Sequence, residues 1–273
     1  MLAAARFFGL MKSWGMQRRG GVSLRYNLLV NEQENPPEKP KKEKKSAREQ
    51  LEAWIWTLVA VFFIRAFVIQ GFVVPSGSME DTLLPGEFLM ALKFTYGLEI
   101  PFTGIKFFQF RKPGRGEMVI FKYPLGNTDF VKRTVGLPGD TIEIRNKVVY
   151  INGVPENNPK VVHKDARVIQ SPLRVGEVMD QWEFQRLWES RKFIENQAVR
   201  DNFGPIVVPD SCVFVMGDNR DFSSDSRFWG PLPLKLLKGT PFIIYFSWNP
   251  SGPWWKVWQR FRWWRMFLPL LGE

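Results

Sequence analysis

The sequence has almost none of the side chains that build disulfides or sulfur–imidazole metal sites. Its 273 residues include one cysteine, Cys212, and one histidine, His163. An intramolecular disulfide is excluded, and so is a Cys/His metal cluster. A cysteine–histidine catalytic pair would have to use these two residues alone. We expect the protein to use no metal and no cofactor.

Acidic residues are missing from the start of the chain, where five cations precede the first acid, Glu32. Such a segment fits either a targeting peptide or a basic cytoplasmic tail, and we favour the tail for residues 1–35. Residues 36–48 follow as a linker rich in proline and lysine, with too little apolar surface to pack. We therefore expect residues 1–50 to form a basic tail and linker.

The net charge is strongly positive, at +11, and twelve residues are tryptophan. A positive surface can bind nucleic acid or an anionic membrane on charge alone, whereas tryptophan prefers the membrane–water interface. Many of the cations flank an apolar stretch or lie in a tryptophan-rich C-terminal segment. We expect a phospholipid bilayer as a partner and no nucleic acid.

One long apolar run, residues 53–69, carries a single charge, Arg65. With residues 70–74 it reaches the roughly 20 apolar residues that a membrane-spanning helix needs. The run is apolar on all sides, which argues against an amphipathic core helix. We expect one transmembrane anchor over residues 51–74. Because basic flanks stay in the cytoplasm, residues 75–273 should form an extracytoplasmic domain.

The remaining chain is dominated by short β patterns. Six stretches are rich in Val, Ile and Phe and are bounded by turn residues: 117–123, 130–135, 141–144, 148–151, 212–216 and 242–247. Residues 145–147 suit a hairpin turn between two of them. This pattern predicts a mainly β domain, either a sandwich or barrel-like.

Two further segments do not follow the β pattern. Residues 155–204 suggest an insertion, in which residues 177–200 look helical and lie on the surface. From about residue 250 to residue 273, tryptophans alternate with basic residues. That mixture can stack on single-stranded nucleic acid or bind an anionic membrane surface. The neighbouring anchor favours a membrane-interface tail.

Three polar stretches hold residues suited to chemistry. Residues 74–83, VPSGSMEDTL, place two serines in a turn made by proline and glycine. Residues 129–140, DFVKRTVGLPGD, place Lys132 on a strand with Phe130 on the same face and Arg133 on the other. Residues 216–230, MGDNRDFSSDSRFWG, follow an apolar strand. Taken singly, each also fits an ordinary loop, a solvated lysine or a surface ion pair.

In this order after a membrane span, the three stretches resemble the bacterial type I signal peptidases, or leader peptidases. The resemblance covers residues 51–153 and 205–248. It implies a signal-peptidase-like catalytic domain, an irregular β-sheet or barrel preceded by one N-terminal transmembrane helix. It also implies a serine endopeptidase that removes signal peptides from exported preproteins.

The resemblance assigns catalytic roles by position. It implies that Ser78 is the nucleophile and Lys132 its general base. Ser76 and the backbone amide of Ser78 would form the oxyanion hole. The third stretch would supply support, with Ser223 hydrogen-bonding the Lys132 amine.

Further residues are assigned in the same way. Asp225 and Arg227 would pair and brace the loop, together with Gly217 and Asp218. The pocket for the residue before the cut would be lined by Val74, Met79, Leu83 and Val131, and the next pocket by Phe72 and Val131. Such pockets suit the small residues of an Ala-x-Ala site. The chain departs from the family at Asp81, Glu87 and Phe222, where Pro, Asp and Asn are usual.

A serine–lysine pair is chemically reasonable only if the lysine is buried. An unperturbed lysine, with a pKa of about 10.4, is protonated at neutral pH and cannot accept a proton. Burial disfavours the charged form and can lower the pKa by roughly 3–5 units. Arginine does not deprotonate. Lys132, and not Arg133, is therefore the candidate base.

We expect a monomer in the bacterial cytoplasmic membrane, with its N-terminus inside, its catalytic domain on the periplasmic side, and its site of action near the secretion machinery. An organelle inner or thylakoid membrane is the alternative location. Competing functions are a self-cleaving repressor, a non-enzymatic membrane-anchored binding protein and a nucleic-acid binder. The first needs a DNA-binding module, the second would lack Ser78 or Lys132, and the third needs its cations on one face.

Overall fold

The structure is a computed structural model that describes residues 46–99, 106–107, 111–171, 173, 175–176, 178–194, 196–253 and 255–270. The expected N-terminal tail and most of the linker, residues 1–45, lie outside the described residues. Helices α2 and α3 are Gln181–Glu189 and Ser226–Trp229, and α4 is Val257–Arg260. Short 3-10 turns occur at Gly77–Met79, Lys93–Tyr96, Gln197–Val199, Leu234–Leu236 and Trp263–Arg265.

The apolar run forms a helix whose residues are all exposed. Helix α1 is Ala47–Phe63, and a π-helical turn, Ile64–Val68, continues it. Its 22 residues correspond to about 33 Å, enough to cross the hydrocarbon core of a bilayer. The helical part ends short of the expected residue 74, because Ile69–Val73 form strand β1 and pair with β2, Glu87–Leu92. The helix and the first strand thus share one apolar run.

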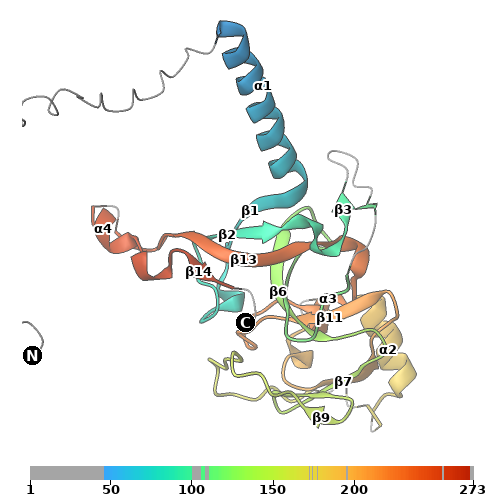
Figure 1. The fold of residues 1–273 in the computed structure, drawn as a ribbon. Helices are drawn as coiled ribbons and strands as arrows, with labels where there is room; N and C mark the ends of the chain where they lie inside the picture. The colour runs from blue at the N-terminus through green and yellow to red at the C-terminus, as the bar shows by residue number, and fades with distance from the viewer. Residues whose placement is uncertain are drawn as a thin grey trace, which may run out of the picture. The chain divides into compact units, whose positions relative to one another are not determined.

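The largest sheet in the described residues is antiparallel and has eight strands (Figure 1). Its order is β1-β2-β13-β5-β6-β11-β12, and β14 pairs with β13. The strands not yet given are β5 Met118–Lys122, β6 Asp129–Gly136, β11 Cys212–Met216, β12 Leu232–Pro233, β13 Leu237–Ser247 and β14 Leu268–Pro269. The prediction of a mainly β domain is confirmed.

Two smaller sheets complete the fold. One has the order β10-β7-β8-β9 and the other pairs β3 with β4. Their bounds are β7 Thr141–Arg145, β8 Val148–Ile151, β9 Val154–Pro155, β10 Phe203–Val207, β3 Leu98–Glu99 and β4 Lys106–Phe107. The β7–β8 hairpin turns through Asn146 and Lys147, both at positive φ, 47° and 74°, as a tight hairpin turn requires.

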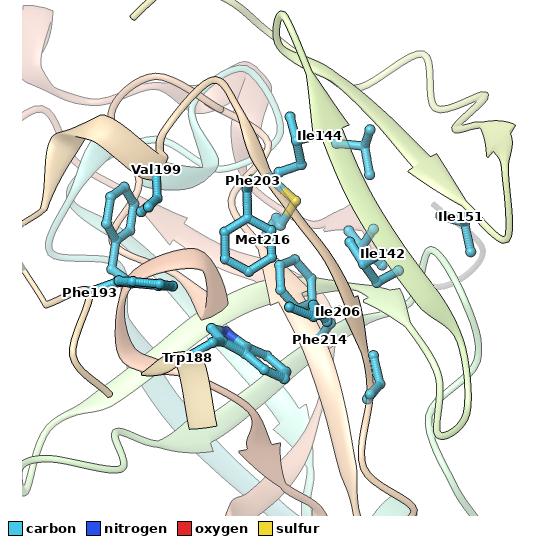
Figure 2. Packing of buried hydrophobic residues seen from close by; sticks show 14 of the residues in the cluster. Ile142, Ile144, Ile151, Trp188, Phe193, Val199, Phe203, Ile206, Phe214 and Met216 are labelled. Carbon is cyan, nitrogen blue, oxygen red and sulfur yellow. The ribbon is translucent and has the colours of Figure 1, made fainter. Parts of the chain in front are cut away.

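The segment expected as a surface insertion also contributes side chains to one of the cores. Phe184 and Trp188 of α2 are fully buried in a cluster with Phe203 of β10 and Phe214 of β11. Figure 2 shows Trp188 close to the Phe203 and Phe214 rings. The Trp188 and Phe214 rings lie 5.9 Å apart, centroid to centroid. Only the opposite face of α2 is exposed, as at Trp182. The helix is amphipathic, with charged residues between its buried aromatic side chains.

Candidate active site

Ser78 lies in the 3-10 turn Gly77–Met79, which follows strand β1 and Pro75. Its side chain is largely buried, at 9% exposed. The chain after it turns back at once, because the amides of Thr82 and Leu83 both donate to the Met79 carbonyl. The hydroxyl of Ser76 lies 3.4 Å from that of Ser78. The turn therefore presents two neighbouring hydroxyls on a short, hydrogen-bonded segment.

Lys132 reaches Ser78 from the central strand β6. Its Nζ donates to Ser78 Oγ at 2.5 Å, across 54 residues of sequence. The side chain is 3% exposed, and its amine lies 5.7 Å from the centre of the Phe130 ring. On one side β5 pairs with β6 at Lys132 itself, through Val119, and on the other side the pairing with β11 ends at the neighbouring Arg133.

The surroundings of Lys132 favour its neutral form. Burial lowers the pKa of Lys132 from 10.5 to about 8. The Arg227 charge acts in the same direction, whereas Asp225 and Asp218 partly offset it. A substantial fraction of the amine is therefore unprotonated in mildly alkaline solution, and Ser78 Oγ is the group that it contacts.

Arg133, the next residue on β6, points to the other face and binds Asp218. Its Nε and Nη2 each donate to one carboxylate oxygen at 2.7 Å, and both side chains are almost fully buried. Thr82 Oγ1 donates to the same carboxylate at 2.6 Å. Asp218 thus joins the segment after Ser78 to the strand that carries Lys132.

The loop after β11 is built around a second buried ion pair, Asp225–Arg227. The guanidinium donates twice to the carboxylate, at 2.8 Å for each oxygen. Burial alone raises the pKa of Asp225, but the neighbouring Arg227 outweighs it and holds the pKa below its usual range. Gly217 lies against this loop: a Cβ there would come within 2.3 Å of the Ser78 carbonyl oxygen and 2.4 Å of Ser223 Oγ. Only glycine allows that approach.

Ser223 is brought to the site but does not make the expected hydrogen bond. Its hydroxyl is buried and, within the described residues, has no hydrogen-bond partner of ordinary geometry. It still lies close enough to Asp225 to lower the pKa of that carboxyl. The Lys132 amine donates to Ser78 Oγ instead.

Comparison with known proteins identifies the family. The family described as "Signal peptidase, peptidase S26" matches residues 47–248. A signal peptidase I of Buchnera aphidicola subsp. Schizaphis graminum is 32% identical over 235 residues, covering 74% of this chain and 75% of that protein. The chain belongs to the signal peptidase family. Signal peptidases remove signal peptides from preproteins, and the family is typically membrane-associated.

Other signal peptidases show the same degree of likeness. The signal peptidase I of Pseudomonas aeruginosa is 33% identical over 206 residues, covering 70% of this chain and 69% of that protein. A solved signal peptidase I from Enterococcus faecalis V583 is 26% identical, with a TM-score of 0.32, and the match covers 48% of this chain and 97% of that one. So low a TM-score adds nothing to the assignment.

The residues expected to line this signal peptidase's substrate pockets fall into two clusters that share Val131. Val74, Met79 and Leu83 pack together in one cluster, and Phe72 packs with Ala91 and Ile120 in the other. Val131 lies against both and is adjacent to Lys132. The two groups assigned by resemblance are therefore also two groups in space.

Cavities of about 610 and 410 Å³ lie elsewhere in the described residues. Arg115, Arg133 and Lys160 are among the residues that line the larger cavity. Ser223 borders the smaller one, and neither cavity includes Ser78 or Lys132. Among the described residues no group of three His, Cys, Asp or Glu side chains is placed to hold a metal ion.

Two residues at this site, Arg133 and Thr82, were given no role by the sequence analysis. Arg133 could have been found, because its alternation with Lys132 on β6 places it on the opposite face. Thr82 could not, because its bond to Asp218 joins residues 136 positions apart. A threonine four residues after the serine has no local pattern that indicates this contact.

The depressed pKa of Lys132 predicts an unusual effect on stability. Below pH 8 the native state holds a buried charge, so Lys132→Met should increase the free energy of unfolding by about 3 kcal/mol. As pH rises from 8 toward 10.5, the native amine loses its proton before the unfolded one and the wild type gains stability. The difference between variant and wild type should therefore shrink over that window. Denaturant unfolding of the full chain in detergent, measured from pH 6 to 11, checks this.

The matched control is Lys122→Met, the same change at an exposed lysine at the end of β5. It should leave stability nearly unchanged at every pH. A Lys132→Met variant that is less stable than wild type at pH 7 would contradict this prediction. It would show that burial of the Lys132 charge does not destabilise the native state.

Proposed function

We propose that this signal peptidase cleaves preproteins by attack of Ser78 on the peptide carbonyl, with Lys132 as the general base. The observation that supports this best is the 2.5 Å contact from Lys132 Nζ to Ser78 Oγ in a buried setting. A serine hydroxyl needs a neighbouring base to become a nucleophile. A lysine with a pKa of about 8 can supply one near neutral pH.

In the proposed reaction, Lys132 takes the Ser78 proton as Oγ bonds to the carbonyl carbon. The ammonium then returns a proton to the leaving amine, and the product is an acyl-enzyme on Ser78. The same amine activates a water molecule, which releases the signal peptide as a free acid. Each step moves one proton through a single nitrogen, so no third titrating group is needed.

The oxyanion hole is proposed at the start of the turn Gly77–Met79. The first amides of such a turn have no acceptor within it, so the N–H of Ser78 is suited to bind a developing oxyanion. Ser76, exposed and two residues earlier, would add its hydroxyl. The loss of one such donor typically lowers the rate by about 100–1000-fold. Gly217, Asp218, Ser223, Asp225 and Arg227 are proposed to hold the serine and lysine in place.

Substitution at the two proposed catalytic residues tests this mechanism. Ser78→Ala and Lys132→Arg should each abolish preprotein cleavage, because the first removes the nucleophile and the second keeps a charge that cannot accept a proton. In the wild type, kcat/KM should rise with pH and level off above an apparent pKa near 8. Cleavage of a purified preprotein in detergent measures both. Activity in Lys132→Arg close to that of the wild type would rule out a lysine base.

We also propose that the enzyme cuts after an Ala-x-Ala-like site. The two clusters around Val131 consist of large, closely packed apolar side chains, and such walls leave room only for small substrate residues. A preprotein with Leu in place of Ala immediately before the cut should lose most of its kcat/KM, whereas Gly or Ser at that position should be accepted. Equal cleavage of the Ala and Leu substrates would contradict this specificity.

The proposed topology is a cytoplasmic segment, residues 1–50, an anchor within residues 51–74, and an extracytoplasmic catalytic domain, residues 75–273. The domain includes the 155–204 segment and the tail from about residue 250. The enzyme is proposed to be a monomer in a bacterial cytoplasmic membrane, near the secretion machinery. This places the Ser78 turn, which follows the anchor after strand β1, close to the outer membrane surface.

The C-terminal tail is proposed to rest in the membrane interface by its aromatic side chains. Its arginines turn inward: Arg260 donates to the carbonyls of Asn249 and Pro250, and Arg262 to that of Pro85. The large side chains turn outward and are between 60% and 80% exposed: Trp255, Trp258, Trp263, Trp264 and Phe267. Insertion of aromatic rings therefore explains the tail better than attraction of its arginines to anionic lipid.

Single cysteines test the topology and the tail together. Cys212 is free and buried, so a Cys212→Ser background leaves one reactive thiol per variant. Val154→Cys, at an exposed position of β9, should react with an impermeant reagent added outside intact spheroplasts. Trp264→Cys should react more slowly in vesicles than in detergent, because the bilayer covers it. Labelling of Val154→Cys only after permeabilisation would contradict the topology, and equal rates for Trp264→Cys would contradict the docked tail.

A further inference from the structure

Arg265 lies beyond residue 248, where the family match ends, yet its guanidinium points into the catalytic domain. The side chain is 15% exposed. Its Nε donates to Glu87 Oε1 at 2.7 Å, and its Nη2 donates to Glu87 Oε2 at 3.0 Å. The same Nη2 donates to the Thr82 carbonyl at 2.7 Å. One side chain of the tail therefore binds both ends of the segment that follows Ser78.

Among the residues that the structure describes, Arg265 is the only cationic partner of Glu87. It is the first residue of β2 and is fully buried. Besides Arg265, its carboxylate accepts from the Leu84 amide at 2.9 Å and the Ser247 hydroxyl at 3.1 Å. A buried carboxylate that loses its guanidinium becomes an uncompensated charge, which strongly favours rearrangement of its surroundings. The segment between Thr82 and Glu87 would be the part to move.

Thr82 transmits this restraint to the proposed dyad. Its carbonyl is held by Arg265 and its hydroxyl by Asp218, while its amide bonds to Met79, the residue after Ser78. Asp218 in turn binds Arg133, the neighbour of Lys132. The chain of contacts from the tail to both catalytic segments is therefore continuous.

The segment also contains a residue, Asp81, in an unfavourable backbone conformation that needs support from its neighbours. Asp81, between Met79 and Thr82, has a φ of 77°. That left-handed conformation is uncommon outside glycine, although aspartate tolerates it better than most residues. Bonds on the next residue, Thr82, maintain it. Loss of the Arg265 bond would therefore remove one of the restraints on this turn.

We infer that Arg265 is a positioning residue for Ser78, so that the C-terminal tail is part of the catalytic apparatus and not only a membrane contact. This rests on the proposed role of Ser78 as the nucleophile. Arg265 touches neither substrate nor the reacting atoms and acts through Thr82 and Glu87. A displacement of about 1 Å in a catalytic group can lower the rate by about 100-fold.

Kinetics of tail variants in the full chain test the inference. Arg265→Ala should lower kcat at least tenfold and change KM less than about threefold, because the nucleophile is misplaced while Leu83 is the only pocket residue within the segment that moves. Arg265→Lys, which keeps the charge beside Glu87, should recover part of the loss. Added guanidinium ions at millimolar concentration should raise kcat of Arg265→Ala, since the vacated site is partly open to solvent.

The matched control is Arg260→Ala, which also removes an inward-facing arginine of the tail. Arg260 donates to the Asn249 and Pro250 carbonyls and forms no hydrogen bond or ion pair with residues 79–87, all of which the structure describes. Its kcat should stay within about twofold of the wild type and should not respond to guanidinium. A purely structural role for the tail would instead affect both variants alike.

Two outcomes overturn the inference. One is wild-type kcat in Arg265→Ala, and the other is a fall in kcat that guanidinium does not reverse and that Arg260→Ala shares. If Arg265→Ala fails to fold, the test uses Arg265→Lys. A normal melting temperature with kcat at least threefold below wild type supports the positioning role, and wild-type kcat overturns it.

Ser78→Ala separates the two proposals, because an active Ser78→Ala refutes the mechanism. An inactive Ser78→Ala with normal Arg265 variants refutes only the positioning role.

Discussion

The burial of the Lys132 amine against the Ser78 hydroxyl is the constraint on which the rest of the site depends. A shift in pKa from 10.5 to about 8 corresponds to about 3 kcal/mol of unfavourable charge burial at neutral pH. That is a considerable fraction of the stability of a typical domain. A flexible site would relieve it by exposing the amine to water. The packing around β6 prevents this, because it leaves Lys132 only 3% exposed.

The charges around the lysine are arranged to leave it without a counterion. Asp218 and Asp225 are both near enough to raise its pKa, but each is bound by its own arginine, Arg133 and Arg227. A carboxylate free of arginine would pair with the ammonium and remove its basicity. Buried ion pairs of this kind contribute little net stability but are strongly selective for one geometry. Here that geometry satisfies both acids while Lys132 donates only to a neutral hydroxyl.

Much of the fold was predictable because it depends on local pattern. Short Val- and Ile-rich stretches gave the central strands, and alternation along β6 separated Lys132 from Arg133 correctly. The end of the helix was not predictable, since the apolar run continues into β1 and only pairing with β2 distinguishes the strand from the helix. The burial of Trp188 and the contact from Arg265 to Thr82 likewise could not be predicted from the sequence. Both join segments distant in sequence, and tertiary packing alone determines which polar group meets which.

The same limit explains why net charge was a poor guide to function. The +11 balance suits a nucleic-acid binder only if the cations share an exposed face. In the described residues, Arg133, Arg200, Arg227 and Arg265 are instead bound to carboxylates in the interior. Such arginines organise the chain and are not available to an anionic partner. The C-terminal tail is the clearest case, since its arginines bind inward while its tryptophans face outward. The C-terminal segment is basic by composition, but its exposed surface is aromatic. Its arginines bind groups of the catalytic domain and hold the segment against it.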